Sequence, residues 1–172
     1  MSVFPDFTNP DTEEFWTSNL IKLNKKIDYS MLWIDMNEIA LIEDPNNNNR
    51  TCNYKPPSYI PKGLQPLHYG TLCYDAKHFI GNHAEVHNLY SYYQARMTRN
   101  ALLKMNKRPF IISRSTFAGS GRFTSHWTGD VYSQWRDLKL SVSNMLEFNI
   151  LGIPVVGADI CGFVVEPTEG KL

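Results

Sequence analysis

This 172-residue chain has little of what marks the specialised protein classes, because it lacks net charge, many cysteines and any long apolar run. Lys and Arg together number 17, and so do Asp and Glu. Nucleic-acid-binding proteins normally carry a basic stripe, so this balance argues against a nucleic-acid partner. A membrane-spanning helix needs about 18 or more consecutive apolar residues, and the chain contains no such stretch.

Targeting signals and thiols are also sparse. Residues 1–10 lack the basic and apolar regions of a signal peptide, so no signal peptide is visible. The three cysteines, Cys52, Cys73 and Cys161, are an odd number, which leaves one thiol free or one partner missing in a secreted protein. A glycosylation triplet at 49–51 is weak evidence for export, because such triplets often occur by chance.

The composition is that of a globular protein, with 42% hydrophobic and 13% aromatic residues. Apolar spacing predicts helices and short apolar runs predict strands, in an order that alternates strand, loop and helix. A parallel sheet with crossover helices follows from that alternation, and the fold class is α/β. Apolar strands also suggest that both sheet faces are covered. The predicted helices are 12–27, 85–106 and 134–151, the main strands are 29–35, 109–113 and 154–158, and a long loop covers 42–81.

Charged residues follow the predicted strands. Asp35, Arg114 and Asp159 each come after an apolar run, and Asp130 follows a shorter one. Because active sites of α/β barrels assemble at the C-terminal ends of the strands, these side chains are expected to share one edge. Two facing carboxylates suit cleavage of a glycosidic bond, although strand-end carboxylates also bind metals or cap helices.

Aromatic and basic neighbours favour the glycosidase interpretation. Trp33 and Trp127 would form apolar walls for a sugar ring, and the fixed fork of Arg114 could hold a carboxylate or sugar hydroxyls. His83 and His87 have a spacing that metal sites use, but no third ligand is suggested, so no metal or other cofactor is expected. The glycines at 119–121 predict a tight turn, and the tyrosines of 85–106 predict core packing rather than a sugar platform.

Several motifs resemble glycoside hydrolase family 31, the family of the α-glucosidases. "WIDMNE" at 33–38 resembles its nucleophile signature, and 108–130 resembles its acid/base signature. "GIPVVGADICGF" at 152–163 resembles the following strand. Shorter stretches at 4–10 and 86–95 are similar to the same family. The resemblance implies a (β/α)8 TIM barrel, of which residues 1–172 would be a fragment bearing the middle strands.

The resemblance also implies a role for each matched residue. Asp35 would be the nucleophile and Asp130 the general acid and base of a retaining α-glucosidase acting on terminal α-1,4-linked glucose of malto-oligosaccharides or glycogen-like glucans. Glu38 belongs to the nucleophile signature, and we expect it to support the loop of Asp35. Arg114 would bind substrate. The remaining residues expected to line or hold the substrate pocket are Trp33, Met36, Trp127, Asp159 and Phe163.

A disulfide between Cys52 and Cys73 is implied by the resemblance, and Cys161 would pair with a cysteine beyond this stretch. The full-length protein is therefore expected in the secretory pathway, either lysosomal or extracellular. The isolated fragment is expected to be insoluble or inactive, because it would have two open sheet edges.

Two alternatives remain open. Val131 follows the acid/base, where the family commonly has Asn, and with the missing strands it favours a degenerate, non-catalytic carbohydrate-binding relative. Another specificity of the same family, such as isomaltase or α-xylosidase, is the second alternative.

Overall fold

A computed structural model describes residues 3–41 and 70–165 of the chain. Its centre is a four-stranded parallel sheet in which spatial order follows chain order. The strands are β1 (Met31–Ile34), β4 (Phe110–Ser113), β5 (Ser125–Trp127) and β6 (Val156–Gly157). Sequential neighbours that are all parallel are the arrangement of a (β/α)8 barrel, so the α/β class and the partial barrel predicted from the sequence are confirmed.

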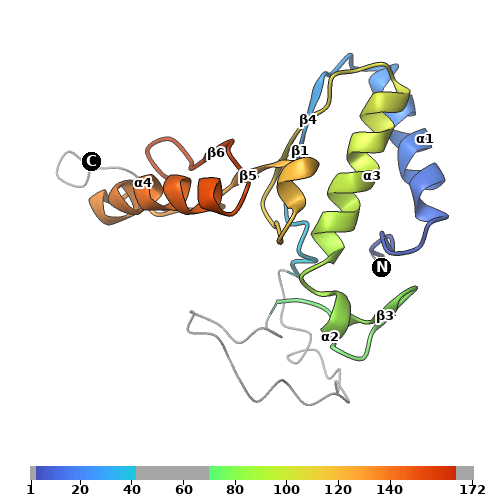
Figure 1. Ribbon diagram of the computed structural model, residues 1–172, viewed down its shortest axis with the longest axis horizontal. Helices are drawn as coiled ribbons and strands as arrows, with labels where there is room; N and C mark the ends of the chain where they lie inside the picture. Colours follow the sequence, from blue (N-terminus) through green and yellow to red (C-terminus); the bar gives the residue numbers. More distant parts are fainter. Residues whose placement is uncertain (1–2, 42–69, 166–172) are drawn as a thin grey trace.

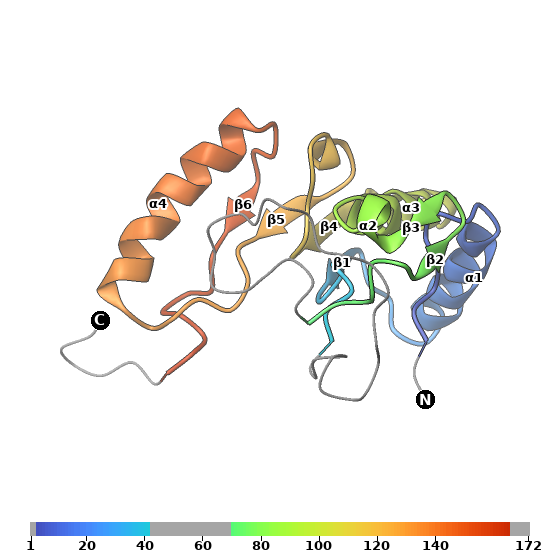
Figure 2. The ribbon, with the colours of Figure 1, turned by 90° about the horizontal axis from the view of Figure 1, so that it is seen from below.

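Helices flank this sheet at its two ends (Figures 1 and 2). The pair α1 (Thr12–Asn24) and α3 (Tyr90–Lys104) lies beside β1 and β4. At the other end α4 (Trp135–Ile150) lies beside β6. Three short elements complete the described chain: the hairpin β2 (Lys77–His78) and β3 (Gly81–Asn82), helix α2 (His83–Val86) and the 3-10 turn η2 (Ser120–Arg122).

The strand register places the predicted site residues on one face of the sheet. Trp33 pairs with Ile112, which pairs with Ser125. The Arg114 N–H donates to the Ile34 carbonyl at 3.2 Å, so the β1–β4 ladder continues one residue past both strands. Side chains of residues paired across parallel strands point to the same face, and that face recurs every second residue. Trp33, Asp35, Arg114 and Trp127 therefore share a face, and the last three form one row.

The opposite face packs against α3. Ile34, Ile111 and Leu102 form one buried cluster. A second cluster joins α3 to α2 and to the segments around Phe7 and Ile39, and its other buried members are Val86, Tyr90 and Met97. Because α3 contributes to both clusters, it fixes the β1–β4 pair relative to the N-terminal segment and to the loop that follows β1. The prediction that tyrosines of this helix pack in the core is confirmed for Tyr90, which is 3% exposed.

Several predicted boundaries were wrong. The predicted helix 85–106 is divided into α2 and α3 by a turn at 87–89. Two local features explain the break: Asn82 and Glu85 form a capping box that starts a separate short helix, and the Leu89 N–H bonds the Val86 carbonyl, a tighter i−3 contact. The predicted loop 42–81 reaches into the β2–β3 hairpin at its end, and 42–69 lie outside the described residues. Helices α1 and α4 are slightly shorter than predicted.

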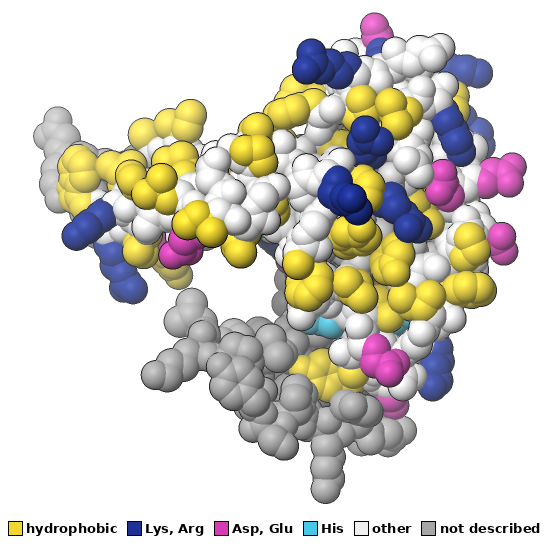
Figure 3. All heavy atoms as spheres, in the orientation of Figure 1, with side chains coloured by type: hydrophobic (Ala, Val, Ile, Leu, Met, Phe, Trp, Pro, Cys, Tyr) yellow, Lys and Arg dark blue, Asp and Glu magenta, His cyan; other side chains and the backbone are white. Residues whose placement is uncertain are grey.

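One face of the sheet is open in the residues that the structure describes. On the face that carries Asp35, Trp33 is 61% exposed and Met31 is 52% exposed. Helix α4 has no buried residue, and apolar side chains gather along it in Figure 3. The exposed apolar residues of α4 include Leu138, Val142, Leu146 and Ile150. In the part of the chain that the structure describes, no helix is long and apolar enough to cross a membrane.

Candidate active site

The loop after β1 holds the first predicted carboxylate in a constrained backbone. Asp35 accepts a hydrogen bond from the Met36 N–H at 2.7 Å. Met36 and Ile39 both have left-handed backbone angles, with φ of 50° and 60°. This conformation is costly for non-glycine residues, above all for a β-branched one, and persists only where the surroundings enforce it. The loop after β1 is therefore held in place by its contacts.

Asn37 supplies one of those contacts. Its side-chain amide donates to Ser113 Oγ at 2.5 Å, and its side-chain oxygen accepts from the Ser115 N–H at 2.8 Å. Asn37 is 3% exposed and Ser113 is fully buried. Since Ser113 and Ser115 flank Arg114, this bridge fixes the loop of Asp35 relative to the end of β4.

Arg114 lies at the centre of the acidic residues. Its guanidinium pairs with Glu38 and lies 3.5 Å from Asp35 Oδ1. Burial favours the neutral form of Arg114, but the hydrogen bond to Glu38 and the charges of Glu38, Asp35 and Asp130 outweigh it and raise the pKa. Asp130 therefore lies close enough to act on the same cation as Asp35. One arginine balances three carboxylates at this edge.

The tryptophans connect this cluster to the end of β6. The Trp33 and Trp127 rings meet edge to face with centroids 5.0 Å apart. The Trp127 indole N–H donates to Asp159 Oδ1 at 2.7 Å. This hydrogen bond fixes the ring plane of Trp127, and with it the apolar wall beside Asp35 and Arg114.

A close backbone contact joins the Asp130 segment to the loop after β6. Gly162 has φ of +84°, and a Cβ placed on it would lie 2.6 Å from Ser133 Cα. The Phe163 N–H also donates to the Val131 carbonyl at 2.8 Å. Only glycine fits both the left-handed angle and the contact. The residue after the predicted acid/base is thus tied through its backbone to the loop of Asp159.

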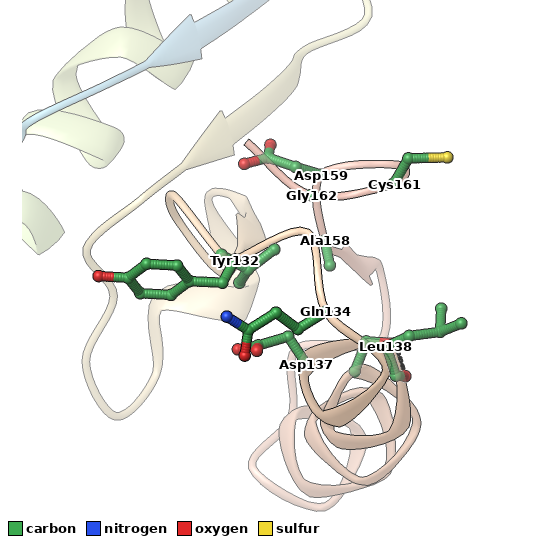
Figure 4. A pocket seen from close by; sticks show the side chains of 10 residues that line it. Tyr132, Gln134, Asp137, Leu138, Ala158, Asp159, Cys161 and Gly162 are labelled. Atoms are coloured by element: carbon green, nitrogen blue, oxygen red, sulfur yellow. Dashed lines mark hydrogen bonds between the residues drawn. The ribbon is translucent and has the colours of Figure 1, made fainter. Parts of the chain in front are cut away.

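Two cavities adjoin these loops. A narrow one separates the start of α4 from the loop after β6, where Asp159 and Cys161 point in opposite directions (Figure 4). A larger one, of about 620 Å³, has Glu38 and Arg114 in its wall and lies under the β4–β5 loop. Its other lining residues are mainly apolar or small and include Phe117, Gly119, His126, Phe148, Leu151 and Ile153.

The structure brings most of the predicted site residues together but not all of them. Ion pairs join Arg114 to Asp35 and Glu38, and the charge of Asp130 acts on Arg114. A ring contact and a hydrogen bond join Trp33, Trp127 and Asp159, and the strand register places the two groups side by side. Met36 and Phe163 have exposed side chains, and among the described residues no hydrogen bond, ion pair or ring contact of these side chains joins them to this cluster; Met36 meets Asp35 only through its backbone N–H. The catalytic and binding roles of all the predicted site residues stay predictions.

The cysteine and metal predictions have different outcomes. Cys73 is disulfide-bonded, but Cys52, its predicted partner, lies outside the described residues. Cys161 is free and exposed. Within the described residues, no group of three or more His, Cys, Asp or Glu side chains is arranged to hold a metal ion.

Sequence reasoning missed several residues that shape the site. Asn37 lies within the "WIDMNE" motif, yet its bridge to Ser113 and Ser115 depends on which strand neighbours β1. The hydrogen bond between Trp127 and Asp159 likewise joins two strands. His78 and Asp6 are further examples, since His78 bonds both Asp6 and the buried His83. The only signal in the sequence was the spacing of His78, His83 and His87.

A carboxylate-rich edge at the C-terminal ends of parallel barrel strands is the arrangement found at the active sites of α/β-barrel hydrolases. Comparison with known sequences then fixes the family. The model of the glycosyl hydrolases family 31 TIM-barrel domain matches residues 1–172. The chain belongs to glycoside hydrolase family 31.

Similar proteins agree with this assignment. The chain is 44% identical to intestinal sucrase-isomaltase of Oryctolagus cuniculus over 98% of its own length and 9% of that protein. It is 41% identical to lysosomal alpha-glucosidase of Bos taurus, over 98% of the chain and 18% of that protein. Among solved structures, a glucosidase II alpha subunit bound to alpha3-Glc2 superposes with a TM-score of 0.74 at 31% identity. That match covers 95% of this chain and 16% of the other.

The chain thus spans less than a fifth of the length of the relatives described above. More distant structures share the fold alone. One is a cycloalternan-degrading enzyme from Trueperella pyogenes in complex with isomaltose, at 23% identity with a TM-score of 0.72 over 96% of this chain and 19% of that one.

Proposed function

We propose that the protein is a retaining α-glucosidase that releases terminal α-1,4-linked glucose from malto-oligosaccharides or glycogen-like glucans. The observation that carries this proposal is the position of Arg114, which contacts Asp35 and Glu38 and responds to the charge of Asp130. Family membership and the names of the similar proteins, alpha-glucosidase and sucrase-isomaltase, support the α-glucosidic substrate.

In the first step a carboxylate oxygen of Asp35 attacks the anomeric carbon of the terminal glucose. The bond between that carbon and the glycosidic oxygen breaks, and Asp130 transfers its proton to the departing oxygen. The product is a glucosyl ester on Asp35 and a shortened glucan. A retaining enzyme needs its two carboxyl groups about 5–5.5 Å apart. Asp35 follows β1 and Asp130 follows β5, with β4 between these strands, so the two side chains would approach each other across Arg114.

In the second step water attacks the same carbon from the face that the leaving group vacated. Asp130, now a carboxylate, takes a proton from the water, and the ester bond to Asp35 breaks. Both catalytic residues return to their starting protonation states. Arg114 stays positive throughout, so it favours the ionised carboxylates that each step regenerates.

The surrounding residues would bind the glucose ring. Trp33 and Trp127 present apolar ring surface beside Asp35, where the sheet face is open. Glu38 Oε2, Thr128 Oγ1 and Asp159 Oδ2 are buried and have no hydrogen-bond partner among the described residues. Because buried acceptors normally find donors, sugar hydroxyls or ordered water would satisfy them.

The decisive experiment compares leaving groups in the full-length protein. Asp35→Ala should lower kcat by about 10⁴-fold on every substrate, because no ester forms. Asp130→Asn should lower kcat on maltose by about 10³-fold. The rate of glucosylation by a nitrophenyl α-glucoside should fall by a factor at least about tenfold smaller, because its leaving group needs no proton. Asp28→Asn, at an exposed aspartate paired with Lys107, is the matched control and should keep normal activity.

Equal losses of rate on both substrates would show that Asp130 is not the general acid. An inactive wild-type protein that still binds an iminosugar in calorimetry would favour the degenerate, carbohydrate-binding alternative. Comparing maltose, isomaltose and a xyloside under the same conditions separates the specificities found within such a family.

We further propose that residues 1–172 are part of a larger barrel whose other strands pair with the free edges of β1 and β6. The exposed apolar face of α4 and the open sheet face support this, since such surfaces are normally covered in a stable protein. The disulfide at Cys73 supports an oxidising compartment, and we place the full-length protein in the secretory pathway.

A further inference from the structure

Three histidines form a continuous hydrogen-bonded line beneath the candidate site. His78 Nδ1 lies 3.2 Å from Asp6 Oδ1, and His78 Nε2 lies 3.1 Å from His83 Nδ1. His83 Nε2 lies 3.2 Å from His87 Nδ1 and 3.1 Å from Thr71 Oγ1. The residues of this line (Asp6, His78, His83 and His87, hereafter the histidine line) come from the N-terminal segment, β2 and α2. The line therefore ties three separate pieces of chain together.

The histidine line has a direction. Hydrogen bonds outweigh the burial of Asp6 and hold the pKa of its carboxyl below the usual value, so Asp6 is an ionised acceptor. Its partner nitrogen, Nδ1 of His78, must then carry the proton. A neutral His83 carries one ring proton: with Nδ1 of His83 donating to His78, its Nε2 accepts from Nδ1 of His87 and from the Thr71 hydroxyl. Every ring is fixed in tautomer and orientation by its neighbour.

Burial keeps the middle of the line neutral. His83 is fully buried, and desolvation together with the neighbouring His87 and His78 lowers its pKa to about 4. The rings of His78 and His83 are stacked with centroids 5.3 Å apart. Because the ring nitrogens bond to one another, they do not converge on a shared point as metal ligands would. The line is therefore a hydrogen-bonded scaffold with a neutral His83 at its centre and the ionised Asp6 at one end.

The far end of the histidine line faces the loop of the nucleophile. Burial lowers the pKa of His87, and the charge of Glu38 opposes that shift. Ile39, next to Glu38, packs in one cluster with Val86, next to His87. The loop of Glu38 contains the two left-handed residues Met36 and Ile39, and such a backbone persists only where neighbouring residues hold it in place.

We propose that the histidine line acts as a positioning device for the reaction: it holds the loop of Glu38 so that Glu38 orients Arg114 beneath Asp35. This rests on the proposed function, because it assigns these residues a part in that same reaction. None of the histidines touches the reacting atoms, and their effect passes through His87, Glu38 and Arg114 in turn. Their loss should therefore change the chemical step more than the binding of sugar.

The test replaces the middle histidine in the full-length protein. His83→Leu keeps volume and burial but breaks both ring contacts, and we expect kcat on maltose to fall about tenfold or more while KM stays within about threefold. Asp6→Asn removes the ionised acceptor that gives the line its direction, and should show the same split if His83→Leu fails to fold.

Tyr90→Phe is the matched control. The Tyr90 hydroxyl donates to the Pro5 carbonyl at 2.7 Å in the same packed region, but it is not part of the histidine line. Its loss should lower Tm and leave kcat within about twofold. A protein that merely needs these histidines for folding would show the Tyr90→Phe pattern in all three variants, and that result would overturn the inference.

The two proposals fail differently. Normal wild-type turnover with unchanged kcat in folded His83→Leu and Asp6→Asn refutes the histidine line alone. A wild-type protein without turnover refutes the α-glucosidase. In that case a crystal structure of His83→Leu decides the line: an unmoved 36–39 backbone with the pair of Glu38 and Arg114 intact overturns it, whereas a displaced loop supports it.

Discussion

The two ends of the sheet differ in how much of their own apolar surface they cover. Helix α3 buries Leu102 and Ala101 completely against β1, β4 and the N-terminal segment. Helix α4, of similar length, buries no residue, although His126 and Phe148 stack with ring centroids 3.9 Å apart. The first end has a core of its own, whereas the second end presents the face on which a core would form. Amphipathic sequence alone does not distinguish the two, because both helices have an apolar side.

The prediction with the largest expected effect tests whether α4 is buried in the full-length protein as α3 is. In the full-length protein, Leu102→Ala should cost about 4 kcal/mol of unfolding free energy, as is typical for a fully buried leucine. Leu146 of α4 is 64% exposed in residues 1–172. If further barrel elements cover α4 in the full-length protein, Leu146→Ala should lower the free energy of unfolding by about 2 kcal/mol or more. Urea unfolding of both variants measures this. A cost below about 0.5 kcal/mol for Leu146→Ala would mean that α4 stays open to solvent.

A second prediction uses one buried histidine from each end. Desolvation is the main cause that lowers the pKa of His83 and of His126 to about 4 each. The folded protein therefore binds fewer protons than the unfolded chain between about pH 6.5 and 4, and stability is lost as the pH falls through that window. Each histidine should contribute about 3 kcal/mol to this loss at low pH.

The measurement is the free energy of unfolding at pH 7 and pH 4 in His83→Leu and His126→Leu. Each substitution should reduce the difference between the two pH values, because it removes one group that must lose its proton on folding. An unchanged difference in His126→Leu would show that water reaches this ring and that the α4 end is looser than its stacking on Phe148 implies.

Much of the fold could be predicted because it depends on local patterns. Short apolar runs marked β1, β4 and β6, and the charged residue after each run marked the edge where Asp35, Arg114 and Asp159 lie. The break between α2 and α3 could not be predicted from periodicity, since Val86, Met97 and Ala101 keep a helical spacing across it. It depends on the capping box of Asn82 with Glu85 and on the hydrogen bond of the Leu89 N–H to the Val86 carbonyl.

The site was predictable in its carboxylates but not in its supports. Asp35 and Asp130 lie in motifs that can be read along the chain. The pair of Glu38 with Arg114 and the bridge from Asn37 to Ser113 cross between strands, so they depend on strand order and register. The histidine line is more distant still, because it begins at Asp6, 72 residues before its first partner. Such contacts become visible only when the chain is folded.

The most direct test of the central claim is to trap the nucleophile. The full-length protein is incubated with a glucose-like cyclitol epoxide, which a carboxylate nucleophile opens to form a stable ester, and the labelled peptide is identified by mass spectrometry. We expect one adduct per molecule, on Asp35, with loss of activity in proportion to labelling. An adduct on any other residue of an active protein, or inactivation that leaves Asp35 unlabelled, would contradict it.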